Sequence, residues 1–123
     1  MSPDIHQWLK KAEGDFETAT REFRARKKPN YDAVCFHAQQ AVEKWLKAIL
    51  IKNRTSFPKA HDLVKLARLC ADFLPMVSAN EPNLEILTRY AGMFRYPGES
   101  ATKGEAATAL ILCASAGNGC YLF

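Results

Sequence analysis

The sequence of 123 residues has no long apolar run, no glycine-rich loop and no stretch of alternating polar and apolar residues. No segment approaches the ~18 consecutive apolar residues that a membrane-spanning helix needs, and the opening MSPDIHQWLKK lacks the apolar core of a signal peptide. The missing alternation disfavours half-buried strands. Without a phosphate-binding glycine loop or a catalytic serine constellation, two common enzyme classes are disfavoured as well.

The cysteines also lack the spacing of a metal site. The four of them, at positions 35, 70, 113 and 120, form no CxxC pair and no zinc-type cluster with histidine. Cys35 and Cys70 fall in helical apolar patterns, where a free cysteine behaves as a small apolar side chain. We therefore expect reduced thiols in a cytoplasmic protein, with neither a metal nor a cofactor.

The charge is only mildly basic. The formal net charge is +4, with 24% charged and 48% hydrophobic residues, which is ordinary for a folded domain and unlike a disordered chain. A dedicated nucleic-acid-binding protein usually concentrates more positive charge. This balance permits contact with RNA or a nucleotide without indicating it.

What the sequence does contain is a series of amphipathic segments. Apolar residues recur at steps of three and four over about 4–26, 31–53, 63–73, 84–96 and 103–116. Prolines at 58, 75 and 97 separate later segments. We predict an all-α protein: an antiparallel up-and-down four-helix bundle with a shorter fifth helix. Residues 1–123 would form one domain with its core at about 5–115, and the tail GNGCYLF is interpreted as a frayed end.

Alternating helix directions would gather several functional groups at one pole of such a bundle. The start of the first helix, the end of the second, the start of the third and the end of the fourth would meet there. The polar residues expected at this pole are Arg54, Lys59, His61, Asp62, Arg95 and Tyr96.

The segment FHAQQAVEKWLKAIL, residues 36–50, carries an ordered line of polar side chains. His37, Gln40, Lys44 and Lys47 recur at steps of three and four between apolar strips. Such a line is most often the solvated face of a bundle helix. The alternative is a groove or a subunit interface that holds a polar ligand or a partner. Glu43 and Lys47 form an i,i+4 pair that would contribute only about 0.3 kcal/mol.

Three segments in order, FHAQQAVEKWLKAIL, FPKAHDLVKLA and RYAGMFRYP, resemble the HEPN domain family. Trp8, Ala12, Asp15 and Phe16 also fit its opening pattern, and the resemblance spans about residues 5–115. It implies an up-and-down helical bundle that is usually a homodimer. Members occur as partners of, or fusions with, minimal nucleotidyltransferases, in some cases as toxin–antitoxin pairs.

Other members are metal-independent ribonucleases with an Arg-x4–6-His motif near the end of the fourth helix. The resemblance implies that His and Arg of two subunits would face each other at the scissile phosphate and leave a cyclic phosphate. Arg95 occupies the arginine position, but residues 100–102 are Ser, Ala and Thr, and no histidine follows His61. Without that imidazole, no group near Arg95 is suited to carry the 2′-hydroxyl proton near neutral pH.

Arg54 and His61 satisfy Arg-x6-His literally, but they lie across a loop that contains Pro58. We interpret this match as chance, and His61 as a residue that precedes or caps the third helix. A basic site at the pole shared with Arg95 stays open as an alternative.

We therefore predict a non-catalytic HEPN protein that forms a homodimer and acts with a nucleotidyltransferase-like partner. It would bind a nucleotide or substrate, or hold the partner. One alternative is a ribonuclease that uses Arg95 with a displaced base such as His61, and another is a dimeric scaffold without a ligand. The candidate binding residues are His37, Gln40, Lys44, Lys47, Arg95 and Tyr96, with Arg54, Lys59 and His61 as a secondary basic pole.

Overall fold

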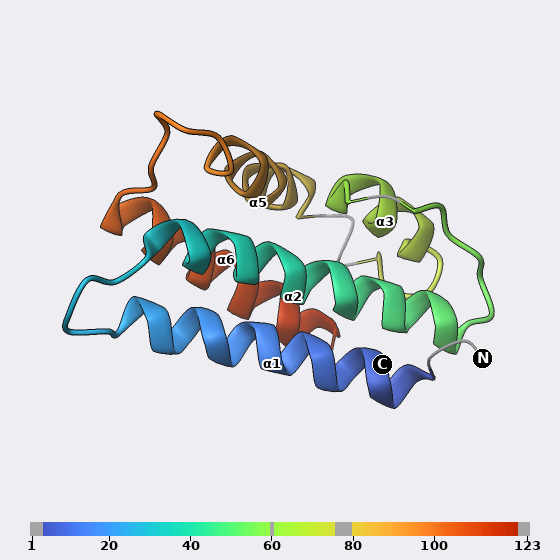
Figure 1. The fold of residues 1–123 in the computed structure, drawn as a ribbon. Coiled ribbons are helices and arrows are strands. Elements are labelled where there is room, and N and C mark those ends of the chain that lie inside the picture. The colour runs from blue at the N-terminus through green and yellow to red at the C-terminus, as the bar shows by residue number, and fades with distance from the viewer. Residues whose placement is uncertain (1–3, 60, 76–79, 121–123) are drawn as a thin grey trace.

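The computed structural model describes residues 4–59, 61–75 and 80–120, and these form a bundle of helices (Figure 1). The all-α prediction is confirmed, since the described ranges contain no strand. Among the described helices, none is both long and apolar enough to traverse a lipid bilayer. The helices are α1 (Ile5–Phe23), α2 (Tyr31–Lys52), α3 (Leu63–Cys70), α5 (Glu81–Met93) and α6 (Lys103–Cys120).

Local chemistry sets where the first two helices begin. The Asp4 carboxylate accepts the Gln7 backbone N–H at 2.9 Å, and the Gln7 side-chain oxygen accepts the Asp4 N–H at 2.7 Å, which completes a capping box. Asn30 caps α2 by accepting the Ala33 N–H at 3.0 Å.

Three helices end at other residues than predicted. α1 ends three residues earlier, α3 ends at Cys70 rather than near 73, and α6 continues past the predicted end to Cys120. The rest of the predicted frayed tail, residues 121–123, lies outside the described residues.

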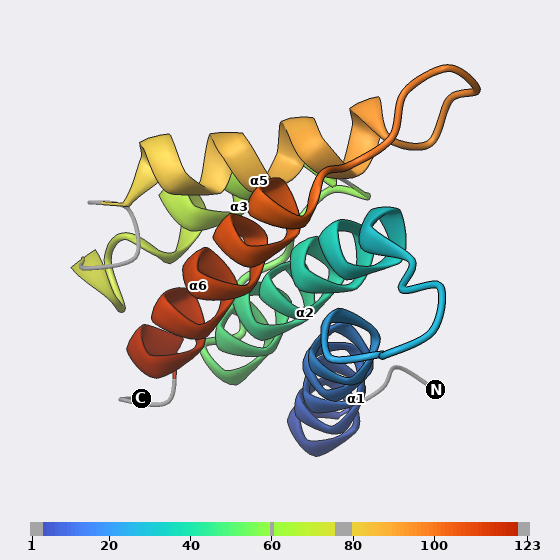
Figure 2. The same ribbon diagram turned by 90° about the vertical axis from the view of Figure 1, so that its left-hand side faces the viewer.

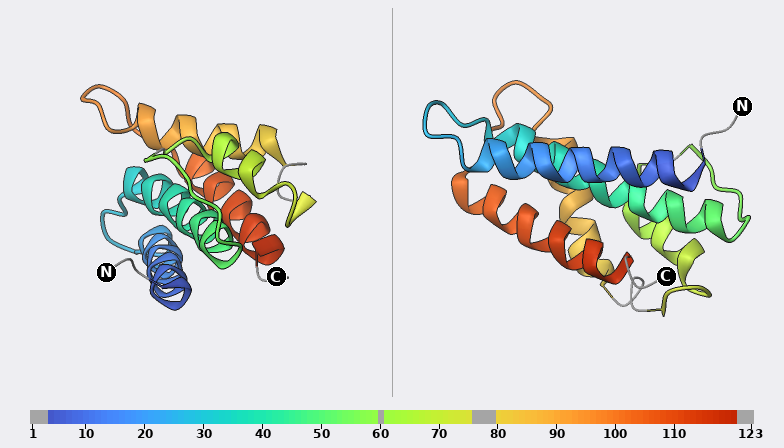
Figure 3. Two further views of the ribbon diagram at one scale, coloured as in Figure 1. Left: turned by 90° about the vertical axis from the view of Figure 1, so that its right-hand side faces the viewer. Right: turned by 90° about the horizontal axis from the view of Figure 1, so that it is seen from below.

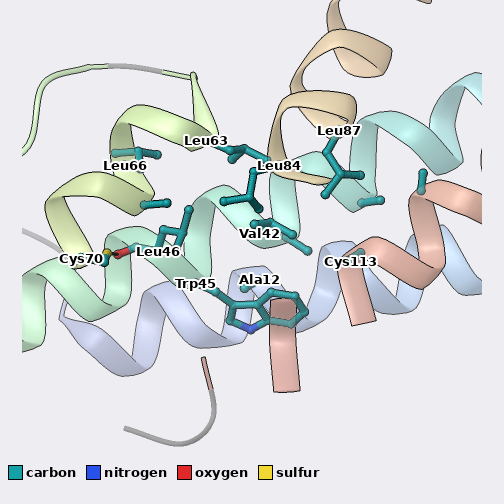
Figure 4. Packing of buried hydrophobic residues seen from close by; sticks show 14 of the residues in the cluster. Ala12, Val42, Trp45, Leu46, Leu63, Leu66, Cys70, Leu84, Leu87 and Cys113 are labelled. Atoms are coloured by element: carbon teal, nitrogen blue, oxygen red, sulfur yellow. Dashed lines mark hydrogen bonds between the residues drawn. The ribbon is translucent and has the colours of Figure 1, made fainter. Parts of the chain in front are cut away.

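α2 occupies the centre of the bundle. It packs against α1, α3, α5 and α6, and Figures 2 and 3 show it enclosed by those neighbours. Most of its apolar residues are fully buried, and Figure 4 shows Val42 facing Leu84 of α5 and Trp45 beside Ala12 of α1. Full burial of such a side chain contributes about 1.5–3 kcal/mol, so this centre supplies much of the stability.

α6 packs closely on α2 at Gly117, which lies against the Trp45 indole. A Cβ added to Gly117 would lie 2.7 Å from the Trp45 indole, closer than carbon atoms can pack. Glycine is therefore required there for α6 to rest on the ring.

The described cysteines behave as buried apolar residues. None of Cys35, Cys70 and Cys113 is in a disulfide. Burial is the main cause that raises the pKa of the Cys35 and Cys70 thiols to about 12. The Cys70 thiol donates to the Leu46 carbonyl at 3.6 Å (Figure 4).

The connection from α2 to α3 doubles back, which corrects the predicted pole. Arg54 adopts a left-handed conformation with φ of +54°, and the Thr55 N–H donates to the Leu50 carbonyl at 2.9 Å. The chain then returns along α2, so that His61 lies beside Glu43, well before the end of α2. Because Cys70 reaches Leu46, α3 runs in the same direction as α2. Among the helices of the described residues, the short one is thus α3, with 8 residues, and not the last helix, which has 18.

α5 runs opposite to α2, and this separates the groups that were expected together. The start of α5 meets the end of α3, where Arg68 pairs with Glu81 at 2.8 Å. The end of α5 reaches the start of α2, because Arg95 borders the same surface hollow as Asn30 and Asp32. Arg54 follows the other end of α2, so Arg54 and Arg95 lie at opposite ends of the bundle (Figure 1).

Candidate functional site

The polar line on α2 is neither a solvated face nor one groove, because α1 covers part of it. Asp15 of α1 contacts two of its members: the carboxylate lies 2.8 Å from His37 Nδ1 and pairs with Lys44 Nζ through its other oxygen. His37 and Lys44 therefore hold α1 against α2. The interpretation of this line as a ligand-binding groove required the Lys44 ammonium to be free, but the ammonium is paired with Asp15.

Lys47 is buried. Its side chain is 10% exposed and its ammonium lies 3.1 Å from Glu43 Oε2, while the Glu43 side chain is only 5% exposed. The ammonium also lies 5.7 Å and 5.6 Å from the ring centroids of Trp8 and Phe57, which allows cation–π attraction. The pair is thus a buried ion pair within the fold, and Lys47 borders neither of the two hollows described below.

Glu43 also connects α2 to the residue before α3. Its Oε1 lies 3.0 Å from His61 Nδ1, and it accepts a hydrogen bond from Gln39 Nε2 at 3.2 Å. The same amide nitrogen of Gln39 donates to the His61 carbonyl at 3.0 Å, and Gln39 Oε1 accepts from Gln40 Nε2 at 2.9 Å. His61 is therefore fixed to α2 through both its backbone and its ring, although its side chain is 80% exposed.

A hollow of about 450 Å³ opens beside this network, between α2, the start of α3 and α5. It brings together the guanidinium of Arg95, the imidazole of His61, the amide of Gln40 and the ring of Phe36. Asp62, whose carboxylate caps α3 by accepting the Val64 N–H at 3.0 Å, adds a negative charge. The full lining is Phe36, Gln39, Gln40, His61, Asp62, Thr88, Ala91, Gly92 and Arg95.

A second hollow, of about 360 Å³, adjoins the first at the start of α2. Arg95, Phe36 and Ala91 border both hollows, and His37 borders only the second. Arg95 therefore stands between two recesses, each of which contains one histidine whose Nδ1 faces a carboxylate.

The structure brings three of the predicted residues together and separates the others. Gln40, His61 and Arg95 share the larger hollow, and His37 borders the adjoining one. Tyr96 follows Arg95 with 70% of its surface exposed and borders neither hollow.

The secondary basic pole is therefore not a single site. Arg54 and Lys59 are exposed, and neither lines a hollow with His61. Of that trio, only His61 lies with Arg95.

Sequence reasoning missed Phe36, Gln39 and Thr88. Phe36 is an apolar residue of α2 that is 38% exposed and lines the larger hollow. Gln39 is buried and contacts Glu43, Gln40 and the His61 carbonyl through its amide. Thr88 accepts the Leu63 N–H at 3.3 Å and so joins α5 to the start of α3. No local pattern marks these residues, since each role depends on a partner distant in sequence.

No group of three or more histidine, cysteine, aspartate or glutamate side chains in the described ranges could hold a metal ion. The side chains that line the larger hollow include a guanidinium, an imidazole, an amide and an aromatic ring. A guanidinium and an imidazole are suited to phosphate oxygens, and a ring can cover a flat heterocycle.

Comparison with known proteins identifies the family. The HEPN domain family matches residues 5–115, so the chain belongs to the HEPN domain family. No curated protein matches the sequence. Among solved structures, TT1696 from Thermus thermophilus is similar, with a TM-score of 0.80 and 20% identity over 95% of each chain. At that identity the likeness supports the helical fold alone.

Proposed function

We propose that this HEPN protein binds a phosphate-bearing ligand, a nucleotide or the nucleotide portion of a larger substrate, in the hollow at Arg95. The observation that carries the proposal is the meeting of Arg95, His61, Gln40 and Phe36 around one recess of about 450 Å³. Arg95 would hold the phosphate through paired N–H donors. Gln40 and Phe36 would contact the base by hydrogen bonding and by stacking.

Binding of AMP, followed by calorimetry and by thermal unfolding, tests this proposal. A bound ligand stabilises the fold by RT ln(1 + [L]/Kd), about 2.7 kcal/mol at a hundredfold excess over Kd. Arg95→Gln should weaken binding at least tenfold. Arg89→Gln is the matched control, because Arg89 is an exposed arginine of α5, the helix that ends at Met93 just before Arg95, and it borders neither hollow. Equal loss in both variants, or no AMP-dependent stabilisation, would remove the basis for the proposal.

The same proposal includes a homodimer and a separate nucleotidyltransferase-like partner. Its support is membership of the HEPN family, in which both arrangements occur. Light scattering of the purified chain measures whether it is a dimer.

The partner is tested by recovering the tagged chain from extract of its own host. The expected result is a nucleotidyltransferase that co-purifies in stoichiometric amount. Expressing each protein alone and both together then tests for a toxin–antitoxin pair, in which growth arrest by one is relieved by the other.

A second candidate function is RNA cleavage, favoured by the placement of His61 and Arg95 in one hollow. His61 would accept the 2′-hydroxyl proton, and Arg95 would stabilise the charge that develops on the phosphate. Cleavage of RNA in EDTA, abolished by His61→Asn and kept by His6→Asn, would establish this reaction. His6 is an exposed residue of α1 and a matched control. Absence of cleavage by the intact protein leaves the binding function.

A further inference from the structure

Glu43 is a buried carboxylate whose position leaves it little freedom. Oε2 receives the ammonium of Lys47 at 3.1 Å, and Oε1 receives the amide of Gln39 at 3.2 Å. With both oxygens held, the carboxylate cannot rotate without breaking a contact. The His61 ring is the exposed end of this arrangement, since its Nδ1 lies 3.0 Å from Oε1.

The chemistry of the contact determines where the His61 proton lies. An ionised carboxylate can only accept hydrogen bonds, so the nitrogen that faces it must carry hydrogen. Nδ1 of His61 is therefore the protonated nitrogen of the neutral ring. Nε2, which has no hydrogen-bond partner within the described ranges, is left for a ligand in the hollow that His61 borders.

We propose that Glu43 is a positioning residue that fixes the orientation and tautomer of His61, so that Nε2 is the nitrogen presented to the ligand's phosphate. The inference deepens the proposed function and rests on it for the identity of the ligand. In the neutral ring Nε2 accepts a hydrogen bond from a protonated phosphate oxygen or a ligand hydroxyl. In the protonated ring both N–H groups donate, one to Glu43 and the other to the phosphate.

Lys47 and Gln39 extend this role into the core. Lys47 supplies the counter-charge to Glu43 at this depth, and a buried carboxylate without a counter-charge is strongly disfavoured. The Gln39 amide donates to the His61 carbonyl at 3.0 Å, and this bond fixes the backbone of His61 relative to α2. A part of the polar line on α2 thus acts on the hollow without contacting the ligand.

Histidine ring nitrogens read by long-range ¹H–¹⁵N correlation at pH 8 test the assignment, and only three histidines have to be resolved. In the wild-type protein His61 should be mainly the Nδ1–H form, against the usual Nε2–H preference of an exposed histidine. In Glu43→Gln the amide has one oxygen, which Lys47 holds because an ammonium only donates. The amide NH₂ then faces Nδ1, and His61 should change to Nε2–H.

Asp15→Asn is the matched control within the same spectrum. Asp15 faces Nδ1 of His37 as Glu43 faces His61, so this change should affect the His37 signals and leave those of His61 unchanged. A His61 ring that is mainly Nε2–H in the wild type, or one that does not change in Glu43→Gln, would overturn the inference.

Titration with AMP distinguishes the inference from the function on which it rests. AMP should shift the His61 Nε2 signal, and Glu43→Gln should weaken its affinity about three- to tenfold, the size expected when a hydrogen bond to a charged group is loosened. Glu85→Gln, the same chemical change on an exposed part of α5, should leave the affinity unchanged. If the tautomer responds to Glu43→Gln but AMP shifts no ring signal, the positioning role stands and the proposed ligand is wrong.

Discussion

Asp15 and Glu43 make the same two contacts in different surroundings. Each carboxylate faces Nδ1 of a histidine and pairs with a lysine ammonium, and α2 supplies both lysines. The Asp15 side chain is 13% exposed, with its partners His37 at 30% and Lys44 at 23%. Glu43 and Lys47, in contrast, are nearly closed off from water, and only His61 reaches it.

The comparison indicates that the contribution of an ion pair to stability depends on its burial more than on its number of contacts. An ion pair that can reach water gains little, because water already stabilises each separate charge. A buried pair loses that hydration, so removing one partner leaves the other charge without compensation. Asp15 should therefore act mainly as a link between α1 and α2, whereas Glu43 should be required for both the fold and the hollow.

The largest expected effect is that of Glu43→Ala. The change leaves Lys47 in an apolar setting and removes the acceptor for Gln39 and His61, so the free energy of unfolding should fall by about 3 kcal/mol. Urea unfolding measures it, with the exposed Glu85→Ala as a control that should stay within about 0.5 kcal/mol of wild type. A loss below about 1 kcal/mol would mean that the Lys47 ammonium reaches water, and the contrast with Asp15 would disappear.

Asp15→Ala should destabilise less, by about 1–2 kcal/mol. Two hydrogen bonds that involve charged groups are lost, but His37 and Lys44 can both turn to solvent. The difference between this variant and wild type should also shrink in high salt more than it does for Glu43→Ala, because exposed pairs are screened more strongly. Equal salt dependence for the two sites would contradict the comparison.

Replacing both partners of the buried pair sharpens the comparison further. Glu43→Leu with Lys47→Met removes both charges and fills their volume with apolar atoms, so the double variant should lie within about 1 kcal/mol of wild type. Each single change should cost more than the double. The coupling free energy, which is the loss in the double variant minus the sum of the two single losses, should therefore be well below the zero value of additive changes. Simple addition of the two losses would show that the charges do not compensate each other.

The smallest effect belongs to the exposed pair Arg68 and Glu81, which joins α3 to α5. The hydrogen bond from Arg68 lowers the pKa of Glu81 below its ordinary value of 4.5. A lowered carboxyl pKa stabilises the fold above the ordinary value, and the contribution is lost as the pH falls through the lowered pKa. Glu81→Gln should therefore reduce the melting temperature slightly near neutral pH, and the difference should vanish in strong acid and in high salt.

The sequence predicted the helices well, because apolar periodicity and caps such as Asp4 are local signals. It did not predict the return of the chain after α2, since a left-handed residue such as Arg54 is specified by the contacts that surround it. The buried pair was missed for a related reason. Glutamate and lysine are rarely buried, so Glu43 and Lys47 look like a solvated pair until Trp8 and Phe57 are known to cover them.

The candidate site shows the same limit. The line of His37, Gln40, Lys44 and Lys47 was visible from spacing, but the partner opposite each residue was not. Arg95 was found from its place at the end of the fourth predicted helix. A strictly alternating bundle also placed Arg95 near His61, but together with Arg54 and Lys59. The chain turns back after α2, so His61 lies beside Glu43 and is separated from Arg54, and apolar periodicity does not predict this turn.

The central position of α2 bears on how the chain reaches its structure. Because α2 contacts α1, α3, α5 and α6, each of these helices packs against it as the chain folds. Folding nuclei commonly form around one helix and the elements that it packs against. α2 and its hairpin partner α1 are close in sequence and need only a short loop to meet, so their pairing requires little loss of chain entropy. Conservative truncations inside α2 should therefore appear mainly as slower refolding, and those on α6, which joins last along the chain, mainly as faster unfolding.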